Sequence, residues 1–212
     1  MAPRGRSRRE WLREAAAAVA GVAAAGALPS AAARAAVVPI PANANRISQS
    51  ASRWCYDRIA LPDLCKAAKE IGLGGIDLLQ REDWDVVTDH GLTVTMGYAA
   101  DRRDFLTNGF TTRSSHPMLI KELENAIPLA AKKGVPNVIA MFGNRAGRGD
   151  IEAIMAATDG LREIAPLAEK EGVTICVELL NSRIDHKDYH GDRTQFGVDV
   201  MKGVGSPNVK LL

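Results

Sequence analysis

Short apolar runs alternate with longer amphipathic segments from residue 46 to the end of the 212-residue chain. The short runs have the length and alternation typical of β-strands, and the longer segments carry apolar residues at helical spacing. The predicted strands are 46–56, 75–79, 92–96, 137–142, 173–180 and 208–212. The predicted helices are 62–71, 82–90, 117–133, 150–171 and 194–204. Strands that alternate with helices in this way indicate a parallel sheet with helical crossovers.

Three of the predicted helices end with the same chemistry. Gly72, Gly134 and Gly172 each follow basic residues in or near the last helical turn, and each precedes an apolar run. Basic side chains are stabilising at the negative end of a helix, and glycine adopts the left-handed conformation that closes it. These glycines therefore mark helix-to-strand boundaries.

Two parallel folds fit this alternation, and the first strand-to-helix connection distinguishes them. A doubly wound dinucleotide-binding fold carries a glycine-rich phosphate loop at that point. Residues 54–62 contain no glycine, and neither G-x-G-x-x-G nor a Walker loop occurs in the chain. A (β/α)8 barrel takes about 250 residues, so six strands and five helices correspond to roughly its first two thirds. We therefore predict the α/β class, an incomplete (β/α)8 TIM barrel that stops in a buried strand at 208–212.

The start of the chain has the pattern of an export signal. Paired arginines at positions 8 and 9 precede an alanine-rich apolar stretch at 15–28 and a small-residue segment at 31–35. This order is typical of a cleaved secretory signal, and the arginine pair resembles the twin-arginine type. A retained membrane anchor is the alternative, but a span needs about 20 strongly apolar residues. We predict a signal peptide at 1–36, a linker at 37–45, a barrel at 46–212, export to the periplasm and no stable membrane anchor.

The charge of the chain changes when this leader is set aside. The formal net charge of the whole sequence is +2, but residues 1–36 hold six Arg and two Glu, so residues 37–212 carry a net charge of −2. A nucleic-acid partner needs a basic surface, so none is predicted. Three cysteines are too few for a disulfide scaffold, and free buried thiols are expected.

The strand at 173–180 carries the strongest candidate for chemistry. Its alternation places Ile175 and Val177 towards the helices, and Cys176 and Glu178 towards the barrel axis. Active sites of these barrels lie at the carboxyl ends of the strands. A carboxylate there is costly unless it binds a cation or moves protons, which makes Glu178 the leading site residue.

Three other residues are candidates to contact a substrate. By the same alternation, Lys210 lies inward on the neighbouring strand. Instead of contacting a substrate, it could form a buried ion pair with Glu178 that has only a structural role. Trp54 and Asn144 stand at the ends of the first and fourth predicted strands. Packing under a loop for Trp54 and turn formation for Asn144 are equally compatible with these residue types.

Two histidines, His186 and His190, follow Glu178 with a spacing of four residues. That spacing presents a metal pair only on a helix, and the residues between them read as a loop, so we predict solvated or structural roles.

Several segments carry a resemblance to a known family. They include Arg-Trp-Cys-Tyr at 53–56, Gly-Asn-Arg at 143–145, Val-Glu-Leu-Leu-Asn-Ser at 177–182 and Asp-His-Lys-Asp-Tyr at 185–189. With residues 64–72, 134–139, 164–170 and 206–212, they resemble the hydroxypyruvate isomerase-like branch of the xylose-isomerase-like TIM barrels. The resemblance runs from about residue 46 to the last residue.

The resemblance implies a divalent cation, Mn²⁺ or Mg²⁺, held by two Glu, one Asp and a His or Gln at the tops of four strands. Hard oxygen ligands suit these cations. Glu178 matches the first ligand, and the other three are expected beyond position 212. We therefore expect this chain by itself to lack most of the metal site and to be inactive.

The predicted function is a metal-dependent isomerase or epimerase of a small sugar or hydroxy-carbonyl compound. The sequence is also compatible with assembly of the protein into a homo-oligomer. Two alternatives differ in kind. An exported carbohydrate-binding barrel without catalysis would bind its ligand without a metal. A DNA-repair endonuclease of the same superfamily would need the basic surface that residues 37–212 lack.

Overall fold

A computed structural model describes residues 47–100 and 104–212. Contacts divide the chain into two units, Met1–Val38 and Pro39–Leu212, and all described residues belong to the second. The predicted signal peptide at 1–36 and the predicted linker at 37–45 lie outside the described residues. Within those residues, no helix is long and apolar enough to cross a membrane.

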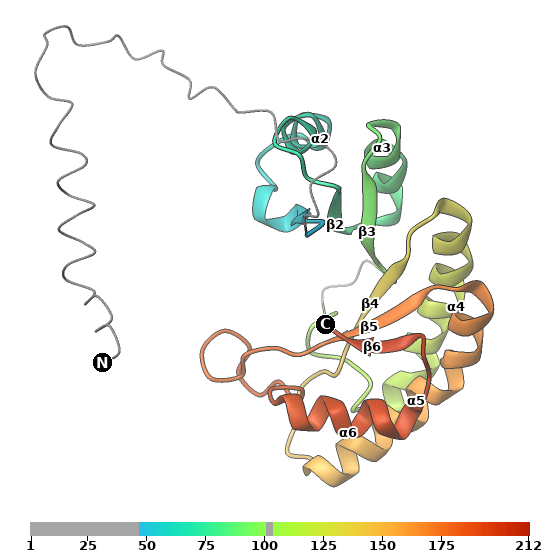
Figure 1. Ribbon diagram of the computed structural model, residues 1–212. Coiled ribbons are helices and arrows are strands. Elements are labelled where there is room, and N and C mark those ends of the chain that lie inside the picture. Colours follow the sequence, from blue (N-terminus) through green and yellow to red (C-terminus); the bar gives the residue numbers. More distant parts are fainter. Residues whose placement is uncertain (1–46, 101–103) are drawn as a thin grey trace, which may run out of the picture. The chain divides into compact units, whose positions relative to one another are not determined.

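The second unit contains a six-stranded parallel sheet whose strands stand side by side in sequence order (Figure 1). The strands are β1 (Ser50–Ser52), β2 (Gly75–Leu79), β3 (Thr93–Tyr98), β4 (Asn137–Met141), β5 (Thr174–Glu178) and β6 (Val209–Leu211). The helices are α2 (Leu61–Glu70), α3 (Trp84–Asp89), α4 (His116–Lys133), α5 (Asp150–Glu171) and α6 (Thr194–Val204). Each strand pairs in parallel with the next, with a helical crossover between them. This is a TIM-barrel-like α/β fold, consistent with an incomplete barrel, as the sequence predicts.

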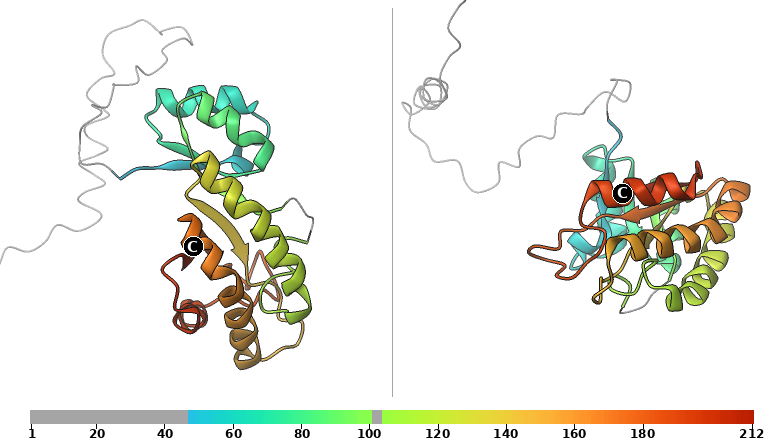
Figure 2. Two further views of the ribbon diagram at one scale, coloured as in Figure 1. Left: turned by 90° about the vertical axis from the view of Figure 1, so that its right-hand side faces the viewer. Right: turned by 90° about the horizontal axis from the view of Figure 1, so that it is seen from below.

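The helices form a layer against the sheet. α2 packs on α3, and α5 packs between α4 and α6, an arrangement that Figure 2 shows from two sides. Right-handed crossovers that each lead to the next strand place successive helices on the same face of the sheet. Apolar side chains of alternate strand residues fill the layer between the helices and the sheet. Asp77, Thr95 and Glu178 are partly exposed strand residues, whereas Ile76, Val94 and Val177 are fully buried.

Most predicted boundaries agree with the structure to within a few residues. β2, α5 and α6 have the predicted bounds. Gly134 and Gly172 close α4 and α5, each with a φ of 69°, in the left-handed conformation expected of such caps. The predicted helix at 82–90 is instead a 3-10 turn, η2 (Arg81–Asp83), followed by the shorter α3.

The first predicted strand, 46–56, is the largest difference. β1 covers only Ser50–Ser52, and the chain then forms a 3-10 turn, η1 (Arg53–Tyr56), in which the Arg53 guanidinium donates to the carbonyl oxygen of Tyr56 at 2.5 Å. Serine and alanine are weak strand formers, so little holds this segment extended. The three cysteines are free as predicted, but Cys55 is exposed in η1 rather than buried.

Candidate active site

The predicted carboxylate, Glu178, is the last residue of β5 and lies at the carboxyl end of the sheet. In the parallel register it stands beside Met141, the last residue of β4. Ile175 and Val177 are fully buried, whereas Glu178 is partly exposed. This is the alternation of a barrel strand with apolar residues towards the helices and the carboxylate on the opposite face. Glu178 therefore lies where the active sites of parallel barrels form.

The surroundings of Glu178 change its acidity. Burial raises the pKa of its carboxyl above the usual range, because the charged form loses contact with water. The charge of His186 acts in the opposite direction and lowers this pKa. A carboxyl group with a raised pKa takes up a proton more readily near neutral pH. This suits a group that removes a proton from a substrate and then returns it.

The raised pKa of Glu178 predicts a pH-dependent stability. The folded protein holds this proton to a higher pH than the unfolded chain does, so stability falls as the pH rises through the folded-state pKa. Below the unfolded-state pKa of about 4.3 the carboxyl is protonated in both states, and the penalty disappears. We expect Glu178→Gln to raise the melting temperature at about pH 8 and to leave it nearly unchanged at about pH 4. Thermal unfolding followed by circular dichroism at both pH values measures this difference. An equal shift at both would contradict it.

Tyr189 fixes the ends of β4 and β5 relative to each other. Its side chain is 1% exposed. Its hydroxyl accepts a hydrogen bond from the N–H of Phe142 at 2.9 Å and donates one to the carbonyl oxygen of Glu178 at 2.8 Å. Because one partner is the peptide of Glu178 itself, Tyr189 sets where the candidate carboxylate leaves the sheet.

The loop between β5 and α6 is also held to the loop that follows β4. Asn144 and Tyr189 form an isolated antiparallel bridge, and the N–H of Arg145 donates to the carbonyl oxygen of Asp188 at 2.7 Å. The N–H of Asn144 donates to the carbonyl oxygen of Thr107 at 2.8 Å. The backbone of Asn144 therefore joins three loops at this end of the sheet. Its side chain is partly exposed there, and contact with a substrate stays a prediction.

Charged groups beneath this loop form a connected network. Arg145 contacts Asp150 at 3.1 Å and Asp192 at 2.7 Å. The Nε2 atom of His190 lies 3.1 Å from Asp150, and His190 is fully buried. Burial lowers the pKa of the His190 imidazole, which favours the neutral ring. His190 thus occupies a structural position, one of the two roles predicted from its sequence context.

Lys210 and Trp54 lie at different distances from Glu178. Lys210 is exposed on β6. It stands in register with Cys176, which precedes Glu178 by two residues on β5. Within the described residues, no ion pair joins Lys210 to Glu178. Trp54 lies in η1 rather than at the end of a strand, and it is 65% exposed. Four strand spacings separate β1 from β5, about 19 Å along the sheet. Lys210 therefore lies on the strand next to that of Glu178, Trp54 follows a strand four positions away, and a role for either in binding substrate stays a prediction.

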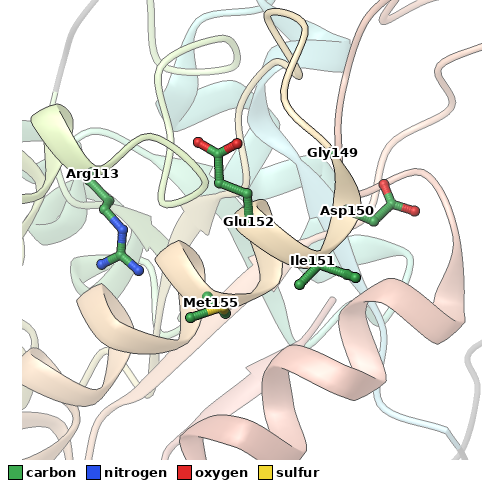
Figure 3. A pocket seen from close by; sticks show the side chains of 6 residues that line it. All are labelled: Arg113, Gly149, Asp150, Ile151, Glu152 and Met155. Carbon is green, nitrogen blue, oxygen red and sulfur yellow. The ribbon is translucent and has the colours of Figure 1, made fainter.

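Two cavities lie near this end of the protein. A cavity of about 340 Å³ adjoins the end of β5 and is lined by Leu179, Leu180, Asn181, Ser182, Arg183, Asp192, Arg193 and Thr194. A larger hollow of about 610 Å³ lies at the start of α5 and is lined by Arg113, Gly149, Asp150, Ile151, Glu152 and Met155 (Figure 3). Ile151 and Met155 are 78% and 57% exposed, so the larger hollow is an open surface depression. The smaller cavity begins one residue after Glu178, which is not among its lining residues.

The implied metal has only a partial fit to these side chains. Within residues 47–100 and 104–212, no three side chains of His, Cys, Asp or Glu converge so that they could hold a metal ion. Glu178 offers a single carboxylate, and the Nε2 atom of His190 is turned to Asp150. The described residues alone do not build a metal site.

Comparison with known families agrees with this geometry. The family described as xylose isomerase-like TIM barrel matches residues 65–212, a region that includes Glu178 and every strand except β1. The chain belongs to this family. No curated protein matches the sequence.

Solved structures share the fold at low sequence identity. An AP endonuclease of family 2 from Brucella melitensis has a TM-score of 0.64 and 18% identity over 78% of this chain and 67% of its own. A D-psicose 3-epimerase in the presence of D-fructose has a TM-score of 0.56 and 13% identity over 78% of this chain and 62% of its own. The 3-keto-D-glucoside 4-epimerase of E. coli has a TM-score of 0.59 and 15% identity over 78% and 67%. This chain thus spans about two thirds of these proteins, and the likeness shows the fold.

Proposed function

We propose that this protein is an isomerase or epimerase of a small sugar or hydroxy-carbonyl compound, of the hydroxypyruvate isomerase-like branch, in which Glu178 moves the proton. The observation that carries the proposal is a partly buried carboxylate with a raised pKa at the carboxyl end of a barrel strand. Two of the similar structures are sugar epimerases, which supports this choice within the family.

The proposed step is a proton transfer next to a carbonyl group. The Glu178 carboxylate removes the hydrogen from the carbon that lies beside the carbonyl and carries a hydroxyl, and the C–H electron pair passes into an enediolate. Return of this proton to the former carbonyl carbon, while the hydroxyl proton passes to the other oxygen, gives isomerisation. Epimerisation needs a proton delivered to the same carbon from the opposite face by a second acid, because Glu178 reaches one face only. The raised pKa of Glu178 suits both directions of transfer.

A divalent cation, Mn²⁺ or Mg²⁺, belongs to the proposal. Glu178 would supply one oxygen ligand. Since no three potential ligands converge among the described residues, we assign no step to the metal. Export through a twin-arginine signal, a periplasmic location and the absence of a nucleic-acid partner remain parts of the proposal that rest on the sequence alone.

The test is turnover with and without metal. The protein is stripped with EDTA and incubated with hydroxypyruvate, D-fructose, D-psicose or D-tagatose, before and after Mn²⁺ or Mg²⁺ is restored, and products are resolved by chromatography. We expect a barrel completed with its remaining strands to convert at least one compound, with activity lost on stripping and recovered with metal, and we expect residues 1–212 alone to be inactive. Binding that is independent of metal and gives no product would favour a carbohydrate-binding barrel without catalysis.

A further inference from the structure

A second carboxylate, Asp77, lies on β2 in a distorted stretch of the sheet. The pairing of β2 with β3 shifts its register on both sides of Asp77. The next residue, Leu78, has a φ of 55°, a left-handed conformation that a bulky side chain rarely adopts. Irregularities of this kind redirect a side chain and occur often beside active sites. The distortion determines the direction in which the Asp77 side chain leaves the strand.

The Asp77 carboxylate is only half satisfied. The Ser50 hydroxyl donates to its Oδ2 atom at 2.8 Å and so fixes the orientation of the group. The Oδ1 atom is buried, and among the described residues no donor reaches it. A carboxylate oxygen removed from water without a hydrogen bond is costly to keep. A ligand hydroxyl that enters this site would supply the missing donor.

Tyr98 ends β3 and follows by two residues Met96, which stands in register with Asp77, so strand alternation places Tyr98 and Asp77 on the same face of the sheet. Burial raises the pKa of the Tyr98 hydroxyl most, and the negative charges of Glu178 and Asp77 raise it further. Its ring packs edge-on against Phe105 with a centroid distance of 5.2 Å. Its hydroxyl makes no hydrogen bond within the described part of the chain, so it has donor and acceptor capacity left for a ligand.

We propose that Ser50, Asp77 and Tyr98 form a hydroxyl-recognition subsite that holds the far hydroxyl groups of a polyhydroxylated substrate whose carbonyl end lies at Glu178. This inference rests on the proposed function and adds a substrate class to it. Three strand spacings separate β2 from β5, about 14 Å along the sheet before curvature and side-chain length shorten the gap. A six-carbon chain matches a gap of several strand widths better than a three-carbon compound does, so this subsite would favour a longer chain such as a ketohexose. A buried group that hydrogen-bonds a hydroxyl discriminates strongly against ligands that lack it.

The test compares binding of long and short ligands by isothermal titration calorimetry. The ligands are D-psicose and D-fructose against hydroxypyruvate, and the proteins are wild type, Asp77→Asn and the control Asp63→Asn. The Asp63→Asn substitution makes the same charge change at an exposed site, where Asp63 pairs with Lys66 at 3.4 Å. We expect Asp77→Asn to weaken ketohexose binding about 10- to 100-fold, the loss typical of a hydrogen bond to a charged group. Hydroxypyruvate binding, and all binding by Asp63→Asn, should stay as in wild type.

Two further measurements keep the inference separate from the proposed function. Tyr98→Phe removes only a hydroxyl and guards against misfolding of Asp77→Asn; it too should weaken ketohexose binding. If ketohexose turnover is lost in Glu178→Gln while both subsite variants bind like wild type, the subsite is wrong and the proposed function stands. If wild type turns over and binds only hydroxypyruvate, the substrate class is wrong although Glu178 is catalytic. Wild type that binds none of the compounds overturns both.

Discussion

In a barrel completed with its remaining strands, Glu178→Gln is expected to abolish isomerase activity while the protein stays folded. The amide keeps the size of the side chain at the end of β5 but can neither accept nor return a proton. General acid–base groups contribute about 10²- to 10⁴-fold to rate, so kcat should fall by at least about 100-fold. Steady-state kinetics with the compound that wild type converts best measures the change, and circular dichroism checks the fold.

The matched control is Glu152→Gln, which makes the same substitution in the larger hollow at the start of α5. Glu152 is exposed, and this variant should keep wild-type kinetics. Loss of activity in Glu152→Gln together with normal turnover in Glu178→Gln would move the active site to the larger hollow.

Tyr189→Phe is expected to destabilise the fold and to reduce activity together. The change removes a hydroxyl that satisfies the N–H of Phe142 and the carbonyl oxygen of Glu178 in a buried position. A buried polar group left without its partner costs about 1–3 kcal/mol, so two of them should lower the free energy of unfolding by about 2–6 kcal/mol. Denaturant unfolding measures this loss. Activity should fall in the protein that remains folded, because the peptide carrying Glu178 loses its anchor.

Tyr56→Phe is the control for removing a tyrosine hydroxyl, since Tyr56 is 43% exposed in η1. Its unfolding free energy should stay within about 0.5 kcal/mol of wild type. Equal stability of the Tyr189 and Tyr56 variants would show that the hydroxyl of Tyr189 does not hold the two strand ends.

The elements with strong local signals are those that the sequence predicts best. α5 begins at Asp150 and ends before Gly172, and its long amphipathic pattern leaves one reading of its bounds. β1 lacks such a signal, because Ser50 and Ser52 extend only where they pair with β2. Its length is decided by tertiary pairing, which a single sequence does not display.

Some residues of the candidate site can likewise be predicted from local sequence pattern, and others cannot. Glu178 follows from strand alternation, which is a local property. Asp77 carries the same signal, a carboxylate within the apolar run Gly-Ile-Asp-Leu-Leu, and the alternation argument applied to β2 would have found it. Tyr189 carries no such signal, because its contacts reach Phe142, 47 positions away, through the fold of a loop. The register of β6, which sets Lys210 beside Cys176, likewise depends on pairing between strands.

Exchange of substrate hydrogen with solvent tests the central claim most directly. A barrel completed with its remaining strands and supplied with Mn²⁺ is incubated in D₂O with D-fructose, D-psicose or hydroxypyruvate, and deuterium at the carbon next to the carbonyl is followed by NMR. The account predicts that wild type incorporates deuterium at that carbon in at least one compound and that Glu178→Gln does not. Exchange that continues undiminished in Glu178→Gln, or no exchange in any compound with wild type, would contradict the assignment of Glu178 as the residue that moves the proton.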